Sequence, residues 1–173
     1  MPFEIIRGDI TETKADAIVN TANPDPVIGS GVDAGIHKKA GAKLLKARKK
    51  IDSIPVGQAA VTPAFDLDAK FVIHAVVPVW EGEEHGEETL LRQCYDNALA
   101  LAAKKRCKSV AFPLLSAGND GFPKAAALQI AVSAFLGGQH RRGEGGGALW
   151  HQRRPRSDLP KRQHGHRAQL RGY

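Results

Sequence analysis

The sequence predicts one α/β domain, in which helices cover both faces of a mixed central sheet. Three short apolar runs have the composition of strands that are buried on both faces. They are residues 16–22, 70–80 and 108–116. Helical patterns alternate with these runs, at residues 35–51, 89–106 and 124–136. Buried strands that alternate with helices are typical of a parallel or mixed sheet covered on both sides.

The first half of the chain is expected to contain two strands, a glycine-rich loop and a helix. The stretch FEII at residues 3–6 predicts a short strand, and GDIT at residues 8–11 predicts a turn. The buried strand at 16–22 then leads into the glycine-rich loop. In residues 35–51, one side of the predicted helix is apolar and the other carries lysines. The apolar side consists of Ile36, Ala40, Leu44 and Leu45.

The second half repeats the alternation. Residues 55–65 predict a turn and a strand, and the nearly continuous β-branched run at 70–80 predicts a buried strand. The long helix at 89–106 has one apolar face, made of Leu91, Cys94, Tyr95, Ala98, Leu99 and Ala102. A further buried strand at 108–116 precedes a second glycine-bearing loop and an Ala-rich helix.

Charge divides the chain at Leu136. Residues 1–136 contain 16 Lys and Arg and 16 Asp and Glu, whereas residues 137–173 contain 9 basic and 2 acidic residues, so the net charge of +7 belongs to the end of the chain. The body therefore gives no electrostatic reason to expect a nucleic-acid partner. Two cysteines and the lack of a long apolar run predict a cytoplasmic protein with reduced thiols, no disulfide framework and no membrane partner.

The last 37 residues differ in composition from the rest. They hold 8 of the 18 glycines and 4 of the 7 histidines and show no period of two or of 3.6. This composition predicts disorder, so we expect a domain over residues 1–136 and a basic tail over 137–173. If the tail is genuine, its positive charge makes RNA or DNA a candidate partner.

Both glycine-bearing loops follow buried strands and precede helices. Such loops meet at the carboxyl edge of an open α/β sheet, where ligands bind. In the first loop, Gly29, Gly31 and Gly35 allow positive φ and a close main-chain approach to a ligand. Main-chain N–H groups before a helix suit an anion, although a plain tight turn explains the glycines equally well.

The polar residues of the first loop allow two interpretations each. Asp33 can be a helix N-cap, or a carboxylate that the loop places beside a ligand. Asn20 and Asn23 can be turn residues, or amides that donate hydrogen bonds at the end of a strand. We interpret His37, one turn into the helix, as a structural histidine.

The second loop offers further N–H groups, at Ser116, Ala117, Gly118 and Gly121. Phe122 can stack on a ligand ring or belong to the core. Asp9 can accept a hydrogen bond from the amine of a base or act as a turn or cap residue. Two phosphate-type loops at one end of a sheet are best explained by a diphosphate.

In order along residues 3–136, five motifs of the chain resemble those of macro domains, which bind ADP-ribose. They are GDIT (8–11), AIVNTAN (17–23), GSGVDAGIH (29–37), VIHAV (72–76) and AFPLLSAGNDGFP (111–123). The resemblance implies a three-layer α/β/α macro domain fold with a mixed central sheet. It is strongest to the branch that hydrolyses mono-ADP-ribosyl groups from acidic side chains and deacetylates O-acetyl-ADP-ribose, so these are the implied substrates. This branch implies neither a cofactor nor a metal.

The resemblance also implies roles for individual residues. Asp9 would bind the adenine amine with Ile10 alongside, and Asn23 would hold the distal ribose. Asp33 would orient or activate a water near that ribose, as a general base does. The diphosphate would lie between the main chains of two loops. They are Gly29, Ser30, Gly31 and Val32, and Ser116, Ala117, Gly118, Asn119, Asp120, Gly121 and Phe122.

Several positions depart from the family pattern. Ser30 replaces a usual glycine, and Asn119 and Asp120 stand where the family has an apolar residue and an aromatic one. A carboxylate beside a diphosphate repels it unless the side chain points to solvent. A macro domain also continues after the Ala-rich helix with a buried strand, an aromatic and a final helix, and none of these is recognisable after Leu136.

We therefore interpret residues from about 137 onward as read in a shifted frame, because one base of shift lets residues 145–151 read Val-Val-Leu-Tyr-Gly. Resequencing the gene tests this. Three hypotheses for function follow: an ADP-ribosyl ester hydrolase, an ADP-ribose-binding module without turnover, and an inactive product with a damaged C-terminus.

Overall fold

The computed structural model describes residues 3–139 and 147–152. Their strands form one six-stranded sheet in the order β1-β6-β5-β2-β4-β3. All neighbouring strands run parallel except β3 and β4, which are antiparallel. The predicted mixed sheet is thus confirmed. None of the described helices combines the length and the apolarity that crossing a bilayer requires.

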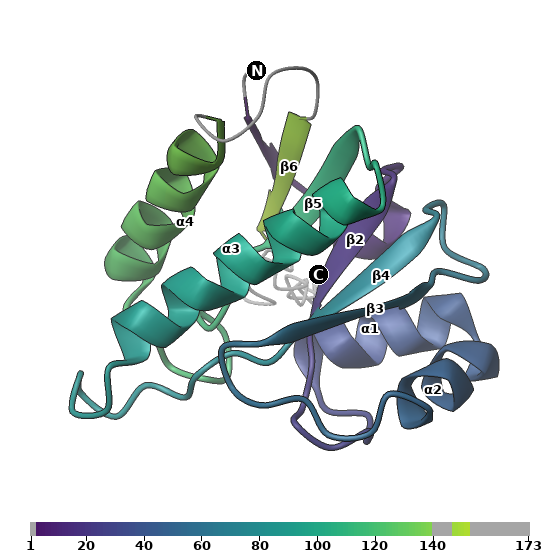
Figure 1. Ribbon diagram of the computed structural model, residues 1–173, viewed down its shortest axis with the longest axis horizontal. Helices are drawn as coiled ribbons and strands as arrows, with labels where there is room; N and C mark the ends of the chain where they lie inside the picture. The colour runs from purple at the N-terminus through teal and green to yellow at the C-terminus, as the bar shows by residue number, and fades with distance from the viewer. Residues whose placement is uncertain (1–2, 140–146, 153–173) are drawn as a thin grey trace, which may run out of the picture.

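The strands are short and the helices cover both faces of the sheet, as Figure 1 shows. The strands are β1 (Glu4–Arg7), β2 (Ala17–Thr21), β3 (Ala59–Pro63), β4 (Phe71–Ala75), β5 (Ser109–Pro113) and β6 (Gly147–Gln152). The helices are η1 (Ile10–Glu12), α1 (Gly31–Ala40), α2 (Ala42–Lys49), α3 (Glu87–Lys104) and α4 (Lys124–Gln139).

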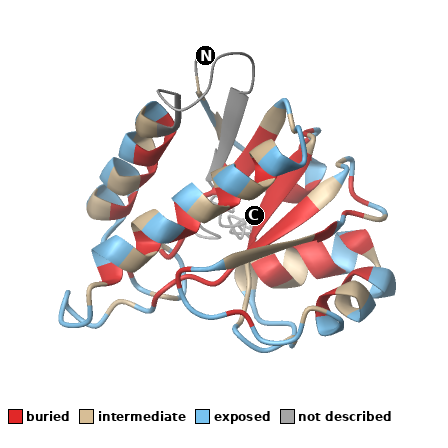
Figure 2. Cartoon of the chain, viewed as in Figure 1, coloured by how far each residue is buried: buried red, intermediate tan, exposed pale blue. Residues whose placement is uncertain are grey.

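Two hydrophobic clusters hold the three layers together, and alternate residues of the central strands belong to different clusters. Val19 and Ile73 pack under α3 and α4, against residues such as Leu91 and Tyr95. Ile18 and Val72 point to the other face and pack against α1 and α2. This alternation explains why the central strands are mostly apolar and are buried except at one end residue each (Figure 2).

The helix predicted over residues 35–51 is two helices, and the first begins four residues earlier than expected. Gly41 separates α1 from α2 with φ of +82°, a conformation that favours glycine. A β-carbon at Gly41 would also lie 2.9 Å from Asp66 Oδ2. The apolar pattern crosses this break without interruption, so periodicity alone does not reveal it.

The end of the domain also differs from the prediction. Helix α4 extends to Gln139, beyond the expected boundary at Leu136. Residues Gly147–Gln152 form β6, which pairs in parallel with β1 and with β5. The disorder that the composition predicts after Leu136 is therefore not found for these six residues. The remainder of the predicted basic tail, residues 140–146 and 153–173, lies outside the described residues.

Candidate functional site

A cleft of about 800 Å³ opens where the carboxyl ends of the parallel strands meet. Its walls include Arg7 at the end of β1, Thr21 at the end of β2 and Pro113 at the end of β5. The two glycine-bearing loops face each other across it. They contribute Asn23, Gly29, Ser30, Gly31, Val32 and Asp33 from one side, and Ser116, Ala117, Gly118, Asn119 and Asp120 from the other.

The first loop becomes helix earlier than the sequence predicts, and this changes the place of Asp33. Helix α1 begins at Gly31, whose φ is +61°, and Ser30 is its N-cap. Asp33 lies in the first turn rather than at the cap. The N-cap interpretation of Asp33 is therefore wrong, and its carboxylate is left for other contacts.

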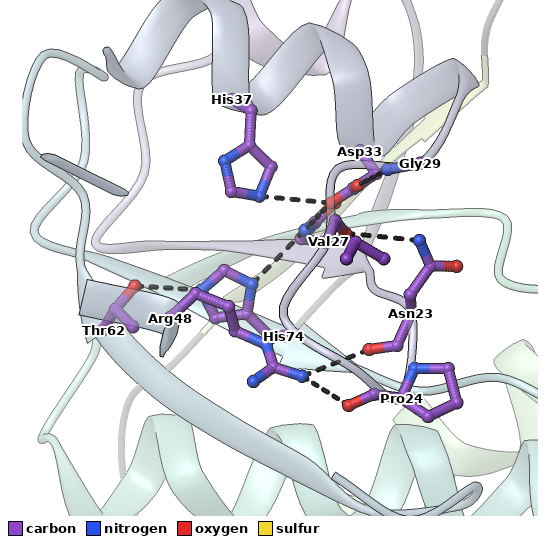
Figure 3. A network of polar contacts seen from close by, with 10 residues as sticks. Asn23, Pro24, Val27, Gly29, Asp33, His37, Arg48, Thr62 and His74 are labelled. Atoms are coloured by element: carbon purple, nitrogen blue, oxygen red, sulfur yellow. Dashed lines mark hydrogen bonds and ion pairs between the residues drawn. The ribbon is translucent and has the colours of Figure 1, made fainter. Parts of the chain in front are cut away.

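Those contacts fix the carboxylate of Asp33 at the wall of the cleft (Figure 3). The main-chain N–H of Gly29 donates to Oδ2 over 2.6 Å. The Asn20 amide donates to Oδ1, also over 2.6 Å. Because Asp33 is only 4% exposed, its charge is stabilised by these charge-assisted bonds rather than by bulk water.

A buried chain of hydrogen bonds continues from Asn20 into the sheet. The second amide hydrogen of Asn20 faces Nδ1 of His74 at 3.3 Å, and Nε2 of His74 lies 3.0 Å from the hydroxyl of Thr62. Nδ1 is then the acceptor, so Nε2–H donates to Thr62. Burial, together with the nearby charges of Arg48 and His37, lowers the pKa of His74 to about 3. His74 is therefore neutral at physiological pH.

His37 approaches the other side of the same carboxylate. Its Nε2 is 3.5 Å from Oδ1 of Asp33, one helical turn away, and the ring is buried. Burial lowers the pKa of His37, and the charge of Asp33 opposes this only in part. The histidine that we interpreted as structural thus lies in contact with Asp33.

Asn23 and Asp33 face each other across Gly29. The Asn23 amide donates to the carbonyl of Val27 over 3.3 Å. A β-carbon at Gly29 would lie 3.0 Å from Asn23 Nδ2 and 3.4 Å from Asp33 Oδ2. The absence of a side chain at Gly29 therefore keeps the space between the amide and the carboxylate open.

The second loop is held in a fixed turn. Ser116 adopts φ of +64°, which is uncommon for a residue with a side chain, and its hydroxyl donates to the Pro78 carbonyl. The N–H of Phe122 donates to the Ser116 carbonyl, and the N–H of Gly121 donates to that of Gly118. Strained backbone that is held by several bonds is frequent at ligand sites.

The three residues that depart from the family pattern all line the cleft. The amide of Asn119 donates to the hydroxyl of Ser30 over 2.6 Å, so the two loops are joined to each other. Asp120 is half-buried, and burial raises its pKa. Its side chain therefore does not simply point away into solvent.

Four predicted residues do not line this cleft. Phe122 is 2% exposed and packs against Trp80, with 4.6 Å between ring centroids, so the core role, one of the two alternatives left open, fits it better than stacking on a ligand. Gly121 adjoins it outside the cleft walls. Asp9 and Ile10 line a separate small pocket, where Asp9 caps η1 by accepting from the N–H of Thr11.

Sequence reasoning missed several polar residues of the site. Arg7 and Lys124 bring positive charge to the cleft wall, and His74 and Arg48 are buried behind it. Arg7 directly precedes the GDIT motif, and His74 is a polar residue within an apolar strand. Both features could have marked these residues as candidates. No three His, Cys, Asp or Glu side chains gather in a metal-binding arrangement within the described residues.

The fold is that of a macro domain, as comparisons with known proteins show. The pattern that defines the Macro domain family matches residues 19–131. An O-acetyl-ADP-ribose deacetylase of Escherichia coli is 48% identical over 134 residues, which are 75% of this chain and 76% of the relative. A macro domain-containing protein of Listeria monocytogenes is 46% identical over 136 residues, covering 76% of this chain and 77% of the relative.

Solved structures show the same similarity. The Oceanobacillus iheyensis macrodomain with ADP has a TM-score of 0.82 and 35% identity, covering 88% of this chain and 83% of that one. The Trypanosoma brucei macrodomain in complex with ADP-ribose has a TM-score of 0.80 and 32% identity, covering 86% and 63%. The chain belongs to the macro domain family, which confirms the predicted family and fold.

Proposed function

We propose that this chain binds ADP-ribose and hydrolyses ADP-ribosyl esters. The substrate is either O-acetyl-ADP-ribose or mono-ADP-ribose linked to an acidic side chain of a protein. The observation that carries the proposal is the carboxylate of Asp33, buried at the cleft wall and held by Gly29 and Asn20 opposite Asn23. The relatives named O-acetyl-ADP-ribose deacetylase support the same class of reaction.

The cleft suits a diphosphate that lies between the two loops. The N-terminus of α1 carries the partial positive charge of a helix dipole, and Arg7 and Lys124 add full charges at the wall. The adenine would lie toward Asp9 and Ile10, whose side of the molecule adjoins Gly31 and Val32 of the first loop. The structures of relatives with ADP and with ADP-ribose support this ligand class.

In the proposed reaction, Asn23 anchors the distal ribose and Asp33 orients a water molecule. Oδ2 of Asp33 accepts one bond from Gly29 and has a second lone pair for that water. The carboxylate accepts a proton as the water oxygen bonds to the ester carbonyl carbon. The ester C–O bond then breaks, and the proton passes to the ribose oxygen that leaves. The products are ADP-ribose and the free acid.

A second candidate function is binding without turnover, or loss of both activities. The half-buried Asp120 would repel a diphosphate, and the bond between Asn119 and Ser30 joins the loops between which the ligand must lie. Both features lower the expected affinity relative to a family member without them. A damaged C-terminus would also lower the affinity for the ligand.

Asp33→Ala separates these functions. We expect it to abolish hydrolysis of O-acetyl-ADP-ribose while calorimetry still detects ADP-ribose binding. Asp96→Ala is the matched control, because Asp96 lies on the surface of α3, where it pairs with Arg92. Turnover by Asp33→Ala at the wild-type rate would overturn the proposed mechanism, and binding without turnover in the wild type would favour the binding module.

A further inference from the structure

Arg48 is the unusual member of the basic side of α2. Its neighbours Lys46 and Lys49 are exposed, as the amphipathic pattern predicts, but Arg48 is only 2% exposed. Taking a guanidinium out of water is costly unless its N–H groups find acceptors. The groups that accept hydrogen bonds from Arg48 therefore indicate which part of the chain it stabilises.

These acceptors are main-chain carbonyls of the loop that follows β2. One terminal nitrogen, Nη2, donates to the carbonyl of Asn23 over 3.2 Å and to that of Pro24 over 2.7 Å. The other terminal nitrogen donates to the carbonyl of Asp52, just beyond the end of α2. Figure 3 shows the guanidinium lying directly against the Asn23–Pro24 main chain.

The same main chain is fixed on both sides of Asn23. The N–H of Ala22 donates to the Ala75 carbonyl, which continues the pairing of β2 with β4. The Pro24 carbonyl accepts a second bond, from the N–H of Ile54. Asn23 is thus held between the sheet and the guanidinium, and its side chain is directed toward Val27 and the space above Gly29.

We propose that Arg48 is a positioning residue, which sets the place of the Asn23 amide relative to the Asp33 carboxylate and thereby the place of the distal ribose. This inference rests on the proposed function of Asn23. The rigid fork of a guanidinium reaches two adjacent carbonyls from one nitrogen while a third bond holds the end of α2. A lysine ammonium is a single point charge on a flexible stem and does not reproduce this arrangement.

The test compares ADP with ADP-ribose, because ADP has no distal ribose. For Arg48→Lys we expect unchanged affinity for ADP, weaker binding of ADP-ribose, and a kcat for O-acetyl-ADP-ribose that falls on the order of 10-fold to 100-fold. Arg92→Lys is the matched control, because Arg92 forms its ion pair with Asp96 on α3 and does not line the cleft. It is expected to leave all three quantities unchanged.

Two outcomes would overturn the proposal. One is an equal loss of ADP and ADP-ribose binding in both Arg48→Lys and Arg48→Gln, with or without loss of a cooperative melt, because Arg48 would then support only the fold. The other is wild-type behaviour of both variants. A wild-type protein that binds ADP-ribose without turnover would overturn the proposed hydrolysis, while the contrast between ADP and ADP-ribose still tests Arg48.

Discussion

Lowering the pH should reduce the free energy of unfolding, because His74 is buried as a neutral ring that joins Asn20 to Thr62 behind the cleft. In the folded protein its pKa is about 3, against an ordinary 6.5, so the unfolded chain binds the proton more readily. The contribution to stability is therefore fully present above pH ~6.5 and is lost as the pH falls toward ~3. Between pH 7 and pH 5 the loss from this residue is about 2 kcal/mol of unfolding free energy.

Urea unfolding of the wild type and of His74→Gln at pH 7 and pH 5 measures this loss. The difference between the two pH values should be about 2 kcal/mol smaller in the variant than in the wild type. His37, whose pKa burial also lowers, contributes in the same direction in both proteins. His85→Gln is the control, because that exposed histidine pairs with Glu81 at the surface. An equal loss in wild type and His74→Gln would refute the reasoning.

Three further substitutions test the cleft and the core beside it. Gly29→Ala would place a methyl group between the facing amide and carboxylate, so ADP-ribose affinity should fall in calorimetry. Asp96→Ala, which changes only the surface of α3, should leave it unchanged. Asn119→Ala removes the bond that joins the two loops, so ADP affinity should rise several-fold in calorimetry, as expected when about 1 kcal/mol no longer opposes binding; unchanged or weaker binding would contradict this. Phe122→Ala should lower the unfolding free energy by about 3 kcal/mol or more, because the ring is buried; reduced ADP affinity at unchanged stability would instead support stacking on the ligand.

Much of the fold follows from local patterns. The runs at 16–22, 70–80 and 108–116 contain β2, β4 and β5, because a strand covered on both faces needs apolar residues on both of its faces. The break at Gly41 was not predictable from periodicity, since the apolar stripe continues across it. Its cause is a positive φ and the approach of Asp66, which depends on tertiary structure.

Strand β6 shows a different limit of pattern reasoning. Residues 147–152 lack the alternation of a half-buried strand, yet they pair on both sides, with β1 and with β5. The hydrogen bonds of a sheet join main-chain groups, which every residue supplies. Neighbouring strands can therefore hold a segment in a strand conformation that its own sequence does not predict. The hypothesis of a shifted reading frame concerns the gene, and resequencing remains its test.

Site residues in the two loops could be proposed from the sequence, whereas polar site residues buried in the core could not. The position of Asn23 and Asp33 in a glycine-bearing loop after a buried strand made them candidates, although a turn and a helix N-cap also explained them, and the resemblance to macro domains implied their roles. The roles of His74 and Arg48 depend on partners 54 and 24 or 25 residues away in the chain. Only the folded sheet and α2 bring those partners together.

Hydrolysis of O-acetyl-ADP-ribose by the full chain, measured as release of ADP-ribose and acetate, tests the central claim most directly. Wild type and Asp33→Ala should be compared at substrate concentrations that calorimetry shows to saturate both. We expect turnover by the wild type and none by Asp33→Ala at equal occupancy of the cleft. Equal rates in the two proteins, or saturation of the wild type without product, would contradict it.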